Sequence, residues 1–128
     1  VFIFDSGARA CVCVVIPAGV GQSEAQVKAI SDLKPTGYCG TPSFLKILIE
    51  KAEELGADIS SIKRALVSGE ALPETLRDWF ADRGIAMLQC YASADLGLIA
   101  YESDAKDRMI VAEDIILEIV RPGTGGRG

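Results

Sequence analysis

The stretch RALVSGEALPETLRDWFADRGIAMLQC, residues 64–90, decides the fold class. Two short apolar runs, residues 64–67 and 85–90, flank a segment that opens at Pro73 and stops at Gly84. Inside that segment the apolar side chains recur at helical spacing: Leu72, Leu76, Trp79 and Phe80. This pattern predicts a strand, a helix and a second strand. Such a unit is typical of a parallel sheet with covering helices.

The same alternation extends toward the start of the chain. Residues 11–16 form a β-branched run that predicts a buried strand, and residues 24–33 show the apolar spacing of a helix. A further strand is predicted over residues 36–40. The helix after it, over residues 42–55, has Thr41 as its cap and Gly56 as its stop. We therefore predict an α/β fold, a mostly parallel sheet with helices on both faces.

The rhythm changes after Leu98. Residues 110–112 and 115–120 read as strands with no helix between them, and a turn-rich tail follows. We expect an α/β nucleotide-binding subdomain over residues 1–109, followed by the first strands of a β subdomain over residues 110–128. Because the tail leads toward a further β element and the chain does not begin with methionine, we expect it to be an excerpt of a larger protein.

Composition narrows the functional classes. The 128 residues carry a net charge of −5 and 49% hydrophobic residues, which is the profile of a globular domain and argues against a nucleic-acid partner. No apolar run is long enough to span a bilayer, so no membrane partner is expected. Four cysteines lie in apolar, strand-like contexts. We predict buried, reduced thiols and a cytoplasmic location. The sequence contains no histidine, which excludes Ser-His and Cys-His catalysis within it.

Three loops leave the carboxyl ends of the predicted strands, over residues 40–43, 68–71 and 91–96. Ligands of open parallel sheets bind beyond such ends, so we expect the loops to converge on one rim. Tyr91 offers a flat face for a base, and Asp95 offers an oxygen ligand for a hard cation. Glu70 supplies a second carboxylate near it.

Each of these residues also has a purely structural interpretation. Tyr91 suits a core aromatic with its hydroxyl at the surface. Ser68 and Gly69 suit an ordinary turn, and Asp95 suits a solvated charge or a helix cap.

A separate glycine pair, Gly19 and Gly21, follows one predicted strand and precedes a helix, as a dinucleotide-binding loop does. Glu24 occupies the third glycine position of the G-x-G-x-x-G pattern, where a carboxylate would repel a pyrophosphate. A nicotinamide-dependent oxidoreductase is therefore the weaker alternative.

The chain contains five motifs in order: VVIPAGVGQSEAQVKAISDLKPT, CGTPSFLKILIEKAEELG, LVSGEALPETLRDWF, CYASADLG and VAEDIILEIVRPGTG. As an ordered set they resemble the adenylate-forming acyl-CoA ligases, most closely the phenylacetate–CoA ligase branch. The resemblance implies activation of an aryl or arylacetic carboxylic acid by ATP and Mg²⁺ as an acyl-adenylate, followed by transfer to coenzyme A. A homodimer is compatible with it. It also implies that the phosphate loop and the catalytic lysine lie outside this chain.

Carried over position by position, the resemblance implies a nucleotide site, a metal site and an acyl pocket. The nucleotide site would be formed by Ser68, Gly69, Glu70, Cys90, Tyr91, Ala92, Ser93 and Ala94. Within it, Tyr91 would stack on the adenine. Asp95 would bind Mg²⁺ as the catalytic carboxylate. The acyl pocket would involve Gly40, Thr41, Pro42 and Phe44.

The sequence YASAD departs from the family pattern Tyr-Gly-x-Ser/Thr-Glu at three positions. Ala92 replaces glycine, which makes a positive φ costly there. Ala94 removes a hydroxyl, and Asp95 is one methylene shorter than glutamate. A non-catalytic homologue that binds nucleotide or acyl group without efficient turnover is the second hypothesis.

Overall fold

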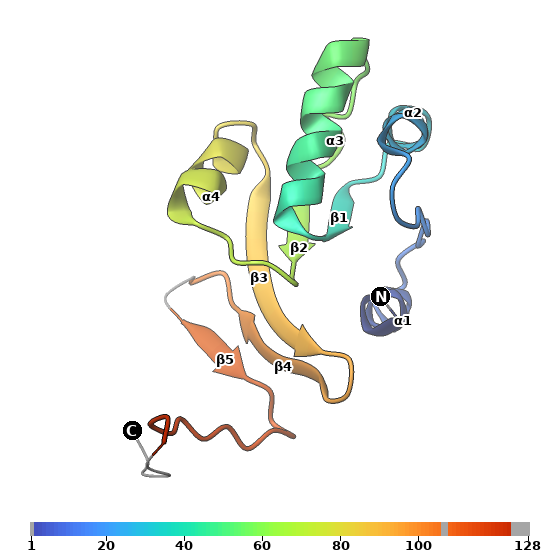
Figure 1. Ribbon diagram of the computed structural model, residues 1–128. Helices are drawn as coiled ribbons and strands as arrows, with labels where there is room; N and C mark the ends of the chain where they lie inside the picture. Colours follow the sequence, from blue (N-terminus) through green and yellow to red (C-terminus); the bar gives the residue numbers. More distant parts are fainter. Residues whose placement is uncertain (1, 106–107, 124–128) are drawn as a thin grey trace.

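A computed structural model describes residues 2–105 and 108–123 (Figure 1). Its helices are α1 Phe2–Ala10, α2 Ser23–Leu33, α3 Pro42–Leu55 and α4 Glu74–Ala81. Its strands are β1 Gly37–Gly40, β2 Arg64–Val67, β3 Ala86–Ser93, β4 Gly97–Glu102 and β5 Met109–Val111. In this part of the chain, no helix has the length and apolar character needed to cross a bilayer.

The five strands form one sheet in the order β1-β2-β3-β4-β5. The first three strands run parallel, and β3, β4 and β5 pair antiparallel. The α/β fold class is therefore confirmed, with a mixed sheet. Because both crossovers step in the same direction along the sheet, right-handed connections place α3 and α4 on one face. Figure 1 shows these helices beside the parallel strands.

The main core lies between this face of the sheet and the two crossover helices. Ala65 and Val67 of β2 point into it two residues apart, as the period of a strand requires, and Met87 of β3 joins them. Its buried members are Leu45, Ile49, Ile62, Ala65, Val67, Leu72, Phe80, Ile85 and Met87. A second cluster of Val27, Leu48 and Ala52 packs α2 against α3.

The ends of α3 form as the sequence predicts. The Thr41 side chain accepts a hydrogen bond from the Phe44 backbone N–H at 3.4 Å, and Pro42 occupies the first turn, where no N–H is needed. Gly56 closes the helix at φ 63°, a left-handed conformation that glycine adopts without strain.

The predicted strand over residues 11–16 is wrong. This segment has neither helical nor strand structure, and the Val12 and Val14 side chains are 92% exposed. A β-branched run becomes a strand only when a neighbour takes its backbone hydrogen bonds, and the described part of the sheet offers none here. The predicted burial of Cys11, Cys13 and Cys39 is wrong as well, because only Cys90 is buried.

The end of the chain also differs from expectation. β5 matches the strand predicted over residues 110–112, whereas within residues 115–120 only Val120 forms a single bridge. β4 was not predicted; it turns β3 into one arm of a hairpin.

Candidate functional site

The carboxyl ends of β1 and β2 are joined by backbone contacts. The Ser68 N–H donates to the Gly40 carbonyl at 3.1 Å. Gly69 turns the chain at φ 84°, and a Cβ there would lie 3.6 Å from the Thr41 methyl group. The structure therefore brings the first two candidate loops side by side.

Glu70 links these loops to the third strand. Its carboxylate accepts hydrogen bonds from the Ser43 hydroxyl at 2.8 Å and from the Ser43 backbone N–H at 3.3 Å. Its backbone carbonyl accepts from the Gln89 side-chain amide at 3.4 Å. Sequence reasoning placed Ser43 in the first candidate loop but assigned no role to Ser43 or Gln89. Ser43 lies in the first turn of α3, and Gln89 lies opposite Val67, where the parallel pairing of β3 with β2 ends.

Tyr91, Ala92 and Ser93 lie in β3 itself and not in a loop beyond it. β3 continues past Val67, the last residue of β2, and pairs with β4 as an antiparallel ribbon. The register shifts between Tyr91 and Ala92, as at a β-bulge. The Tyr91 side chain is 57% exposed, so the core-aromatic alternative is wrong.

Asp95 lies in the turn that joins β3 to β4, and both it and Ala94 are exposed. The Ser93 hydroxyl stabilises this turn by accepting from the Leu96 N–H at 3.1 Å. Glu70 is held at the level of Gln89, and Ser93 lies four residue steps, roughly 13 Å, further along the strand. The structure therefore does not place Glu70 beside Asp95.

The donor chemistry at Asp95 suits a weakly ligated Mg²⁺. No group of three acidic, cysteine or histidine side chains converges among the described residues. Mg²⁺ accepts such a site because it keeps several water ligands and needs only one or two carboxylates from the protein. A single exposed carboxylate in a turn is compatible with that requirement.

Cys90 is a structural residue next to the site. It is buried, and the Ser68 side chain lies beside its thiol. Burial raises its pKa, and the Ser68 contact offsets this only in part. Because the thiolate is the nucleophile, burial disfavours the reactive form of Cys90.

The four acyl-pocket candidates have visible structural roles. A Cβ on Gly40 would overlap the Tyr38 hydroxyl, while Thr41 caps α3. Pro42 is buried in the first turn of that helix, and the half-buried Phe44 packs on the cluster between α2 and α3. Their role at an acyl group remains a prediction.

The glycine pair near the start of the chain serves a local purpose. Gly19 and Gly21 have positive φ, and their carbonyls, with that of Ala18, face the side-chain amide of buried Gln26. The shortest of these contacts is 2.7 Å, to Gly21. Because no strand precedes this loop within residues 2–18 and its carbonyls point inward, the dinucleotide alternative is wrong.

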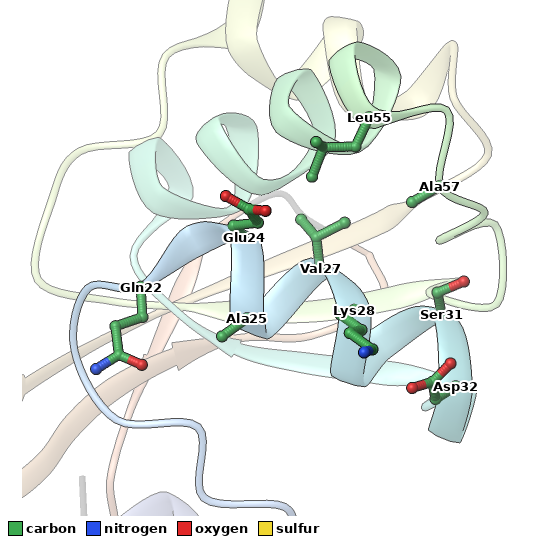
Figure 2. Close-up of a pocket in the computed structure, with 9 residues that line it drawn as sticks. All are labelled: Gln22, Glu24, Ala25, Val27, Lys28, Ser31, Asp32, Leu55 and Ala57. Atoms are coloured by element: carbon green, nitrogen blue, oxygen red, sulfur yellow. The ribbon is translucent and has the colours of Figure 1, made fainter.

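A shallow pocket lies away from the candidate rim, between α2 and the end of α3 (Figure 2). Its apolar floor includes Val27, Leu55 and Ala57, and Glu24 and Lys28 stand among its polar residues. None of the candidate site residues lines it.

Comparisons with known proteins agree with the ordered motifs. The chain is 30% identical over 126 residues to the phenylacetate-coenzyme A ligase of Aromatoleum evansii, covering 93% of this chain and 29% of that protein. The enzymes of the same name from Pseudomonas putida and Escherichia coli are each 32% identical over the same shares. The chain thus spans under a third of the length of these relatives.

Solved structures show the same fold. A 2-hydroxyisobutyryl-CoA ligase in complex with 2-HIB-AMP and CoA superimposes with a TM-score of 0.74 at 23% identity, over 82% of this chain and 24% of that one. The anthranilate CoA ligase AuaEII in complex with anthranoyl-AMP gives 0.60 at 19% identity, over 75% and 19%. A sequence profile described as AMP-binding enzyme matches residues 6–115. Since this match spans most of the 128 residues, the chain belongs to the family of AMP-binding enzymes.

Proposed function

We propose that this chain is the nucleotide-binding part of an ATP-dependent acyl-CoA ligase. The enzyme activates an aryl or arylacetic acid, phenylacetate-like, as an acyl-adenylate and transfers it to coenzyme A. The observation that carries the proposal is the junction of the three parallel strand ends through Ser43, Glu70 and Gln89, in a member of the AMP-binding family. The similarity to three phenylacetate-coenzyme A ligases supports the choice of acid.

The nucleotide would lie across this junction. The exposed ring of Tyr91 stacks on the adenine, and the turn after β2 borders its edge. The residues that surround the nucleotide are Ser68, Gly69, Glu70, Cys90, Tyr91, Ala92, Ser93 and Ala94. Bare backbone and small side chains suit the α-phosphate, because they let amide dipoles approach the charge that develops there.

Asp95 is the proposed Mg²⁺ ligand and catalytic carboxylate. A bound Mg²⁺ would neutralise phosphate charge as the acid attacks and pyrophosphate leaves. Asp95 itself would orient the metal from the β3–β4 turn. Gly40, Thr41, Pro42 and Phe44 would lie near the acyl group at the start of α3.

The remaining assignments concern the setting of the enzyme. Residues 1–109 form the α/β nucleotide-binding unit, and residues 110–128 begin a β subdomain. We place the enzyme in the cytoplasm, a location that suits its four free cysteines. We further propose that the enzyme forms a homodimer.

The test is pyrophosphate release by the whole protein. With ATP, Mg²⁺ and a panel of aryl and arylacetic acids, we expect release that depends on at least one acid. The Asp95→Asn variant should lose most of it and remain folded. Absence of release across the panel would overturn the proposal.

The altered YASAD sequence favours a second candidate, a homologue that binds nucleotide without efficient turnover. In the structure Ala92 is not among the residues with positive φ, so the missing glycine causes no backbone strain. The missing hydroxyl at Ala94 and the shorter side chain of Asp95 remain unfavourable for binding the phosphate and Mg²⁺. The triple variant Ala92→Gly, Ala94→Thr, Asp95→Glu separates the two candidates. A large gain in adenylation favours the second candidate, whereas a loss shows that the present sequence is adapted to catalysis.

A further inference from the structure

A shielded ion pair lies where β3 leaves β2 and joins β4. Arg77 on α4 contacts Glu102 at the end of β4, with 2.8 Å between Nη2 and Oε1. The two side chains are only 15% and 11% exposed, less than those of the other ion pairs in residues 2–105 and 108–123. Moving one partner of a shielded pair away leaves the other charge poorly solvated, so such a pair resists rearrangement.

Both partners also hold the backbone of β3. The second carboxylate oxygen of Glu102 accepts from the Gln89 N–H at 2.8 Å, and Arg77 Nη1 donates to the Met87 carbonyl at 3.1 Å. Residues two apart in a strand present these groups on the same edge. The pairing of β3 with β4 begins one residue later, at Cys90. The Arg77 and Glu102 side chains therefore extend the hydrogen bonding along this edge of β3, from Cys90 back to Met87.

Gln89 is the point where these contacts meet the candidate site. Its N–H is held by Glu102, its side chain holds the Glu70 carbonyl, and Tyr91 follows two residues later. A displacement of Gln89 would change the spacing between the turn after β2 and the Tyr91 ring. The affinity for a nucleotide held between these two elements would therefore change.

We propose that Arg77 and Glu102 are positioning residues for the nucleotide. They act through Gln89 to fix the distance between the Glu70 loop and the Tyr91 end of β3, and they touch no substrate themselves. This inference rests on the proposed function. Arg77 uses both terminal nitrogens of its planar guanidinium to reach a carboxylate and a carbonyl at once, and the single nitrogen of a lysine cannot reproduce that geometry.

The experiment measures ATP binding, in the presence of Mg²⁺, by the whole protein and its variants. Glu102→Gln keeps an acceptor for Gln89 and removes the charge, and Arg77→Lys keeps the charge and removes the fork. Glu53→Gln is the matched control, because Glu53 pairs with Arg83 at 3.6 Å and is 62% exposed. We expect roughly tenfold weaker ATP binding for Glu102→Gln, because the hydrogen bonds from Arg77 and Gln89 to position 102 lose their charge assistance. Arg77→Lys should lie between it and the control, which should stay within about twofold of wild type.

Two further readouts separate positioning from a purely structural role. The melting temperature shows whether each variant is folded at the assay temperature. Amide hydrogen exchange over residues 88–93 should accelerate in Glu102→Gln and not in the control. Unchanged exchange there, or unchanged ATP affinity in a folded Glu102→Gln protein, would overturn the inference. Failure of the wild-type protein itself to bind ATP would instead overturn the proposed function.

Discussion

Gly40 offers a test of whether a candidate acyl-pocket residue must be glycine because of packing within this fold or because of the acyl group it would face. A Cβ at this position would overlap the hydroxyl and ring of Tyr38, whose hydroxyl donates to the Thr41 carbonyl at 3.2 Å. In Gly40→Ala the ring must move. Overpacking costs about 1–3 kcal/mol and the lost hydrogen bond about 0.5–1.5 kcal/mol. Against this, alanine stabilises by about 0.4–1 kcal/mol through the unfolded chain. The net loss is about 0.5–4 kcal/mol in the free energy of unfolding.

The assay is urea unfolding of the whole protein, with two matched variants. Gly37→Ala on the same strand is the control, because a Cβ there would meet only the Arg64 carbonyl, at 3.9 Å. Tyr38→Ala removes the ring, so adding Gly40→Ala to it should cost nothing or stabilise slightly. A destabilisation by Gly40→Ala that persists unchanged without the ring would refute the steric argument. A change confined to the KM for the acid, with stability intact, would identify Gly40 as an acyl-pocket residue instead.

Three other predictions concern the same end of the sheet. Thr41→Ala should lower the free energy of unfolding by about 1 kcal/mol in urea titrations, since it removes the cap of α3, whereas Thr41→Ser should keep most of it. Burial raises the pKa of Tyr38 from 10.0 to about 12, so the stability it contributes is complete below pH 10 and is lost as the pH rises toward 12; unfolding titrations of Tyr38→Phe should lack this loss. Asp95→Asn changes an exposed turn residue and should leave the melting temperature unchanged while Mg²⁺-dependent pyrophosphate release falls; a matched fall in stability would contradict a metal-binding role.

The parallel part of the fold was accessible from sequence because its signals are local. Alternating apolar runs, the Thr41 cap and the Gly56 stop each act within a few residues, and each predicts the element that forms. The family could be recognised for a different reason, because the five motifs occur along the chain in the same order as in the family.

What the sequence could not provide was the choice of strand partners. The run at residues 11–16 has the composition of a strand and no described partner strand, so it forms a turn after α1 and an irregular, mostly exposed segment. Conversely, β3 runs on through Ser93 because β4 takes over as its partner when β2 ends at Val67. The Arg77–Glu102 contact, 25 residues apart in sequence, depends on that same pairing.

The change of partner strand along β3, from β2 to β4, determines where the proposed site can bend. Beyond Gln89, β4 is the only strand that pairs with β3 among the described residues. The irregular register at Tyr91 and Ala92 is the natural place for this hairpin to bend. From there to the tip is roughly 10 Å, so a rotation of ~10° would carry the Asp95 carboxylate by about 2 Å. The hairpin is thus a short lever anchored at its base, so bending at Tyr91 and Ala92 displaces Asp95 while the helices stay still.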